Sequence, residues 1–304
     1  MKPADATRLI LLAAIWGASF LFIKLALRDF TSLQVVFLRL ATGAGVLVGL
    51  VALRRGRLPK GRQLWVPLWI MGAVGNVLPF FLIAWGEQRI PAGLAAILNS
   101  TTPLFTAVLA VIFVPNERVN LMRAAGIVLG FVGVAVITDA GGRSASELVA
   151  VLAVVVAALA YAVAFVSAAR ILPKSPGSPL VLSAGQIAAA TAITLPFVAF
   201  DSVGNLHLPG VVPLLSVLAL GALGTGAAYV LYYRLINDVG PTSASLVTYL
   251  VPVFGVLLGW LALGETLGLK TLVGAVLVIT GVVVSERGAR AARSRAEEAT
   301  KAAA

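Results

Sequence analysis

The tetrapeptide GAVG at residues 72–75 returns as GALG at residues 221–224, an offset of 149 (221 − 72). The same offset, shortened by one residue further along the chain, aligns other residues of the two stretches. The pairs are Leu82 with Leu231, Pro103 with Pro252, Phe105 with Phe254, Glu117 with Glu265, Gly126 with Gly274 and Gly133 with Gly281. The sequence therefore predicts that one structural unit occurs twice.

The composition indicates a protein that lives in a lipid bilayer. The chain has 304 residues, of which 60% are hydrophobic and only 12% charged, and its mean hydropathy is +1.02. A soluble domain carries about 25% charged residues. This chain has too little polar surface to cover itself in water, so we predict an all-α, multi-pass membrane protein.

Ten apolar runs divide the chain, and each is close to the ~20 residues that a helix needs to cross a bilayer. They cover residues 7–27, 31–53, 64–86, 92–113, 119–138, 147–170, 178–200, 211–235, 241–263 and 269–286. A cleaved signal peptide is the alternative for the first run. The repeat needs this first helix, however, and the run ends at Lys24 and Arg28 instead of a small-residue cleavage site.

The repeat and the spans together predict two five-helix units, 1–139 and 147–286, followed by a tail at 287–304. An odd number of helices makes the second unit enter the membrane from the opposite side. Inverted repeats of this kind are typical of secondary transporters, which bind substrate near the midplane where the halves meet. We expect the Ala-rich tail to be cytoplasmic and either disordered or lying on the membrane surface.

The positive charges predict the orientation. The net charge is +11, and the loop 54–62 alone holds four arginines and one lysine. Loops on this side carry most of the basic residues, which indicates that both termini are cytoplasmic. Because the charges lie in short loops between apolar runs, we exclude nucleic acid as the partner.

Polar and aromatic residues in the middle of the spans are the candidate substrate site. They are Trp16, Ser19, Asn76, Phe80, Asn99, Ser100, Tyr161, Gln186, Thr225, Tyr229, Thr248 and Tyr249. The alternative for any single hydroxyl or amide is a bond between neighbouring helices. Pro103 and Pro252, at matched positions, are candidate hinges, because a mid-helix proline frees a carbonyl and bends the helix.

Four charged residues near these spans have structural or gating interpretations. Arg39 either binds a substrate carboxylate or snorkels to the outer face and pairs with Asp29 or helix-end carbonyls, and Lys24 is interpreted in the same way. Glu117 and Glu265 precede helices and are expected to neutralise the N-terminus of the next helix, or to gate.

The distribution of acidic residues constrains the energetics. No Asp or Glu falls in the middle third of any span, so we expect neutral or zwitterionic substrates. For the same reason we expect transport that does not depend on a buried carboxylate, by facilitated diffusion or exchange, or with a proton held elsewhere.

Other function classes lack their signatures. The chain has no cysteine and one histidine, His207 in a loop, and it has no P-loop. We therefore expect no metal, no cofactor and no enzyme activity. An intramembrane enzyme and a channel or sensor are the alternatives. The GxxxG pairs, such as Gly126 with Gly130, indicate helix packing inside a monomer or in a weak homodimer.

Four stretches resemble the drug/metabolite transporter superfamily, in its ten-helix branch with two EamA-type repeats. They are WGASFLFIK (16–24), FLRLATGAGVLVGL (37–50), PAGLAAILNSTTPLFTAVLAVIFVPNE (91–117) and GPTSASLVTYLVPVFGVLLGWLALGE (240–265). The resemblance implies a central cavity between helices one to four and six to nine, and export of small metabolites such as amino acids across a bacterial inner membrane. Pro115 and the non-equivalent pairs Asn76/Thr225 and Pro79/Ala228 depart from exact symmetry.

Overall fold

The computed structural model describes residues 3–113, 120–138, 144–171, 178–201, 208–244 and 246–302, and all regular elements in these ranges are helices. The first half holds α1 (Pro3–Ala26), α2 (Ser32–Leu53), α3 (Arg62–Gly72), η1 (Ala73–Val77), α4 (Leu78–Glu87), α5 (Ala92–Asn99), α6 (Thr102–Phe113) and α7 (Leu121–Thr138). The second half holds α8 (Ala145–Ile171), α9 (Pro179–Asp201), α10 (Val211–Gly221), η3 (Ala222–Ala227), α11 (Ala228–Ala244), α12 (Val247–Leu263) and α13 (Leu269–Ala302).

These helices confirm the predicted membrane architecture. Within the described ranges, nine helices or helix runs are long and apolar enough to cross a membrane. The tenth, α12, is apolar but has only 17 residues. The predicted run 241–263 began earlier. In the structure, Gly240 leaves the helical conformation (φ 81°), residues up to Ala244 belong to α11, and α12 begins at Val247.

The repeated tetrapeptides lie where the third helix of each half widens into a π-helix. Gly72 directly precedes η1, and Gly221 directly precedes η3. A Cβ on Gly72 would lie 3.0 Å from the carbonyl oxygen of Gln186 on α9, and one on Gly221 would lie 2.7 Å from that of Arg39 on α2. Each widened helix therefore packs closely on the second helix of the opposite half, as a two-fold relation between the halves requires.

The fourth span is interrupted next to Pro103. Helix α5 ends at Asn99 and α6 begins at Thr102. The hydroxyls of three consecutive residues donate to nearby carbonyls around the interruption, over 2.6–2.8 Å: Ser100 to Ile97, Thr101 to Leu98, and Thr102 to Asn99. Local side chains thus satisfy carbonyls that no water at this depth would bond. Pro252, in contrast, lies inside the continuous helix α12.

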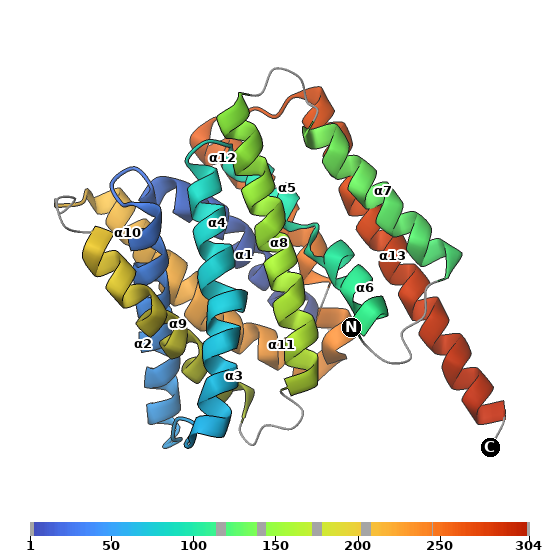
Figure 1. The fold of residues 1–304 in the computed structure, drawn as a ribbon, viewed down its shortest axis with the longest axis horizontal. Helices are drawn as coiled ribbons and strands as arrows, with labels where there is room; N and C mark the ends of the chain where they lie inside the picture. The colour runs from blue at the N-terminus through green and yellow to red at the C-terminus, as the bar shows by residue number, and fades with distance from the viewer. Residues whose placement is uncertain are drawn as a thin grey trace.

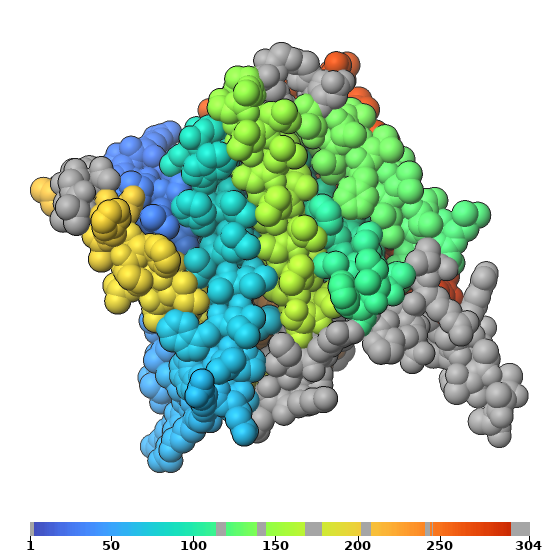
Figure 2. Space-filling model, viewed as in Figure 1, coloured from blue at the N-terminus to red at the C-terminus, as the bar shows by residue number. Residues whose placement is uncertain are grey.

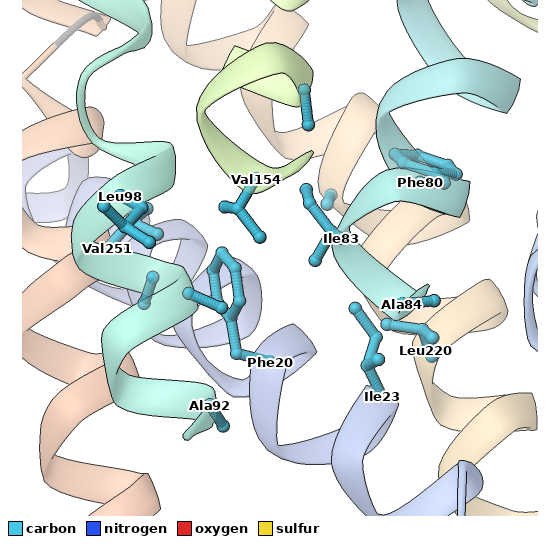
Figure 3. Close-up of a cluster of buried hydrophobic side chains, with 14 of the residues drawn as sticks. Phe20, Ile23, Phe80, Ile83, Ala84, Ala92, Leu98, Val154, Leu220 and Val251 are labelled. Atoms are coloured by element: carbon cyan, nitrogen blue, oxygen red, sulfur yellow. The ribbon is translucent and has the colours of Figure 1, made fainter. Parts of the chain in front are cut away.

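Both halves contribute to one apolar core. Figure 3 shows Phe20 and Ile23 of α1 facing Ile83 and Ala84 of α4, with Val154 of α8 closing the same cluster. These side chains are at most 4% exposed. The halves are therefore packed together and are not two separate domains.

The outer surface of the bundle is apolar. Figure 2 shows α8 between α4 on one side and α6 and α7 on the other, as one continuous face. The exposed residues of α8 include Leu148, Leu152, Val156, Leu159 and Val163, which recur every three or four positions. Such a stripe suits contact with lipid chains.

Helices α7 and α13 lie side by side at one edge of the bundle (Figure 1). A Cβ on Gly126 would lie 2.3 Å from the backbone nitrogen of Ser285, and one on Gly281 2.4 Å from that of Gly130. The GxxxG pair Gly126/Gly130 therefore packs inside the chain.

The C-terminal tail continues the last helix. Helix α13 runs without interruption to Ala302, so the described part of the tail is helical and the expectation of disorder is wrong for it. Its Ala, Arg and Glu residues favour helix.

Replacing Gly281 with alanine will loosen the α7–α13 pair. The added Cβ meets backbone atoms that have no rotamer to change, so we expect a loss of about 1–3 kcal/mol. Thermal unfolding in detergent measures this loss. Gly49→Ala is the matched control, because nothing lies within 4 Å of its Cβ position. Equal melting temperatures for the two variants would contradict the close approach.

Candidate functional site

A chain of polar side chains joins the two halves inside the bundle. The Gln186 amide on α9 donates to Asn76 Oδ1 over 2.6 Å, and Asn76 Nδ2 donates to the Tyr229 hydroxyl on α11 over 3.3 Å. Asn76, in η1, is 1% exposed. One first-half amide therefore bonds two helices of the second half, with a good partner on each side.

The equivalent position in the second half makes the reciprocal contact. Thr225 lies in η3, 149 residues after Asn76 (225 − 76), and its hydroxyl accepts a bond from Arg39 Nε on α2 over 3.2 Å. A π-helix adds one residue to a turn and rotates the side chains that follow, and such bulges are frequent at functional sites. The two π segments thus aim Asn76 and Thr225 at the opposite half.

Arg39 is buried at the interface between the halves. Its side chain is 7% exposed, and its Cζ lies 3.6 Å from the centroid of the Phe80 ring. No carboxylate lies within salt-bridge distance of it among the described residues. The predicted pairing with Asp29 is wrong, because Thr225 and Phe80 hold the guanidinium inside and Asp29 instead accepts the backbone N–H of Gly210 over 2.7 Å.

Aromatic rings surround these polar groups. Tyr161 of α8 contacts Phe80 edge-on at 6.4 Å and stacks on Phe165 at 6.3 Å. On α11, Tyr233 lies 6.3 Å from Tyr229 and 5.9 Å from Tyr232. Trp16 of α1 lies 5.4 Å from the Tyr232 ring. We name the following set the central cluster: Trp16, Arg39, Asn76, Phe80, Tyr161, Gln186, Thr225, Tyr229, Tyr232 and Tyr233.

Five other candidate residues make contacts outside this set. The Ser19 hydroxyl bonds the Ile15 carbonyl and lies against Gly224, at the edge of the central cluster. Asn99 and Ser100 lie at the interruption of the fourth span, where Asn99 Oδ1 is buried without a partner in the described structure. Thr248 and Tyr249 lie on the first turn of α12, where Tyr249 packs against the apolar core.

Two of the other charged candidates, Glu265 and Lys24, bind helix ends. Glu265 accepts the backbone N–H groups of Ala92 (2.8 Å) and Gly93 (3.0 Å), so its carboxylate lies at the N-terminus of α5. The prediction named the next helix along the chain, but the helix it meets belongs to the other half. Lys24 donates to the carbonyls of Glu87 and Ile90 at the end of α4. Glu117 lies outside the described residues.

Sequence reasoning missed Glu87, Tyr232, Tyr233 and Ser183. Glu87 ends the third span and is 0% exposed. It lies outside the middle third of its span, which is the part where a buried acid is expected from the sequence. Ser183 donates to the Tyr233 hydroxyl over 3.0 Å. The spacing of Tyr229, Tyr232 and Tyr233 places all three near one helix face, which was a usable signal.

Comparison with known proteins identifies relatives over nearly the whole chain. The EamA-like transporter family matches residues 7–139 and again 148–286. A Bacillus subtilis protein named uncharacterized transporter YdfC is 26% identical over 90% of this chain and 87% of its own. The Escherichia coli K12 protein named uncharacterized inner membrane transporter YedA is 28% identical over 91% of this chain and 89% of its own.

Two further matches add a named solute class and a fold. A Streptantibioticus cattleyicolor protein, named probable terminal-alkyne amino-acid exporter, is 29% identical over 94% of this chain and 95% of its own. A solved crystal structure with 21% identity superposes with a TM-score of 0.63 and covers 95% of this chain and 99% of that one. At this identity the crystal structure supports the fold alone.

Truncating Asn76 to alanine will cost more stability than truncating a hydroxyl that bonds its own helix. The change leaves the Gln186 amide and the Tyr229 hydroxyl without their partner, so we expect a loss of about 1–3 kcal/mol. Thermal unfolding measures it, and a double-mutant cycle with Tyr229→Phe isolates the Asn76–Tyr229 bond. Thr191→Ala is the control, because the Thr191 hydroxyl donates to the Ile187 carbonyl of its own helix, one turn earlier. A loss no larger than the control's would show that the contact between the halves is unimportant.

Proposed function

The chain belongs to the EamA-like transporter family, and from that premise we propose that it exports small zwitterionic metabolites such as amino acids by alternating access. It is a multi-pass protein of the inner membrane, and its relatives are named transporters, so a transport role without enzyme activity is supported. The name of the amino-acid exporter among them supports the solute class.

Arg39 is the observation that carries the substrate chemistry. It is a buried cation, within the central cluster, whose charge no described carboxylate offsets at close range. A buried ion is expensive unless it is paired. The carboxylate of an amino acid would supply the missing charge, and a guanidinium binds carboxylates through two parallel N–H bonds. Thr225 already fixes Nε, which leaves the two terminal nitrogens for such a ligand.

The aromatic residues suit the rest of such a solute. An ammonium group is attracted to the faces of Tyr and Trp rings, and Tyr161, Trp16 and Tyr229 lie around the polar centre. Apolar side chains of the solute would lie against the same rings. We therefore assign the carboxylate to Arg39 and the remainder of the solute to the aromatic wall.

Contacts between the halves at both ends of the bundle support alternating access. At the end where α1 begins, Arg8 pairs with Asp238 of α11. At the opposite end, Asp29 binds Gly210, Thr31 donates to Asp201, and Glu265 binds the N-terminus of α5. In this mechanism the two sets break in turn, and the two-fold relation of the halves gives the two states similar energies. The cytoplasmic placement of both termini stays a prediction.

Amino acids will stabilise the purified protein, and their decarboxylated amines will not. A ligand at 100 times its Kd adds about 2.7 kcal/mol to the folded state, which raises the melting temperature. We expect Arg39→Gln and Trp16→Leu to abolish the shift. Arg89→Gln is the matched control, because Arg89 is exposed and stacks on Trp85.

Asn99→Ala and Tyr249→Phe test the candidates outside the central cluster. Loss of the shift in these variants would extend the site to the fourth and ninth spans. Equal stabilisation by an amino acid and its amine, or an unchanged shift in Arg39→Gln, would contradict the assignment of the carboxylate to Arg39. Saturable counterflow in proteoliposomes, with competition between solutes, separates a carrier from a channel.

A further inference from the structure

Glu87 is a fully buried acid whose carboxylate bonds none of the described residues. It ends α4, is 0% exposed, and neither carboxylate oxygen has a hydrogen-bond partner in the described structure. Ile83, Ala84 and Ile90, three or four positions from it in the chain, are buried and apolar, whereas Gln88 and Arg89, which directly follow it, are exposed. The function proposed above does not use this group.

Among the described residues, none of the nearest charges forms an ion pair with the Glu87 carboxylate. Lys24 on α1 donates to the backbone carbonyls of Glu87 and Ile90, not to the Glu87 carboxylate. Arg39 on α2 bonds Thr225 and stacks on Phe80. Glu265, which follows α12, is held by the N–H groups of α5 and adds a second negative charge near Glu87.

The other helices packed around Glu87 bring no compensating charge. The wall that α8 presents to the adjacent Gly86 consists of Ala150 and Val154. Among the α8 residues whose side chains the structure describes, up to Ser167, the titratable groups are Tyr161, in the central cluster, and Glu147, on the first turn beside Ser144. The first turn of α5, which meets Glu265, consists of Ala92, Gly93 and Leu94 and carries no titratable side chain.

An ionised carboxylate in these surroundings would be costly. Removing a charge from water costs several kcal/mol unless a partner and hydrogen bonds replace the water, and Glu87 has neither. A carboxyl group escapes that cost by binding a proton. Inside membranes, buried acids of this kind mark proton pathways.

We propose that Glu87 is a proton-binding site that couples transport to proton movement. The inference rests on the alternating-access function proposed above. In the packed arrangement described here, the carboxyl holds a proton. When α1, α4 and the Glu265 segment separate, water enters and the carboxyl releases that proton as hydronium. The carboxylate then attracts Lys24 away from the α4 carbonyls, which keeps that end open until a proton returns.

This proposal replaces an expectation drawn from the sequence. The absence of acids from the middle third of each span predicts transport that needs no buried carboxylate, by facilitated diffusion or exchange or with a proton held elsewhere. The structure places a buried acid at the end of a span instead, where helix packing, and not depth along the helix, removes it from water. If Glu87 couples transport to proton movement, a proton gradient drives the solute against its own concentration gradient.

Infrared spectroscopy of the full-length protein in lipid nanodiscs tests the proton directly. With carboxyl-¹³C glutamate, we expect a carboxylic-acid C=O band at neutral pH in the wild type and in Glu147→Gln. The band will be absent from Glu87→Gln and from Glu87→Leu, whose apolar side chain suits the buried position. Absence of the band from the wild type, or its persistence in both Glu87 variants, overturns the proposal.

Proteoliposomes test the coupling, with a mixture of the twenty radiolabelled amino acids as the probe. An imposed pH gradient should drive accumulation in the wild type and in Glu147→Gln, and at least tenfold less in Glu87→Gln. Counterflow without a gradient should persist in Glu87→Gln. Normal gradient-driven accumulation in that variant overturns the coupling. Absence of wild-type counterflow with every amino acid refutes the proposed function instead, and the infrared band then decides the protonation of Glu87 alone.

Discussion

The structure depends on the absence of water at the depth where its polar side chains lie. Each amide, hydroxyl and guanidinium in the middle of a span needs a protein partner, because lipid offers none. Asn76 and Thr225 find theirs across the boundary between the halves, on α9 and α11 in one case and on α2 in the other. These polar side chains therefore gain their hydrogen-bond partners only when the two halves pack together.

Arranged in this way, the polar contacts between the halves have specific partners within a larger apolar interface. Most of the interface is apolar, as the cluster of Phe20, Ile83 and Val154 shows (Figure 3), and apolar surfaces slide at little directional cost. Hydrogen bonds and ion pairs at the centre and at the two ends carry the directional preference. A solute or a proton that competes for one of these bonds shifts the balance between states by the difference in its affinity for them.

The architecture and most members of the central cluster followed from the sequence alone. Lipid thickness fixes span length, and an odd helix count fixes the inversion. Asn76, Gln186 and Tyr229 were predicted together because each is polar near mid-span, and the structure bonds them into one chain. The position of a residue along its span can be read from the sequence. For these residues, that position was enough to predict that they lie together at the centre of the bundle.

The sequence does not show in which direction around its helix a side chain points, or which residue of the other half it contacts. Tyr249 has the right depth but lies outside the central cluster, on the first turn of α12. Glu265 meets α5 and not the helix that follows it, and Arg39 is held inside by Phe80. Glu87 is buried only because segments from both halves enclose it. Each of these outcomes depends on tertiary packing that a single span does not encode.

Distances between spin labels at the two ends of the bundle test alternating access most directly, and the absence of native cysteine makes the labelling clean. One pair replaces the exposed Thr7 and Asn237 beside the Arg8–Asp238 contact, and the other replaces Arg28 and Leu208 beside the Asp29–Gly210 contact. In nanodiscs, the account predicts two distances for each pair, with one pair lengthening as the other shortens when solute or pH changes. A single unchanging distance for both pairs would contradict it.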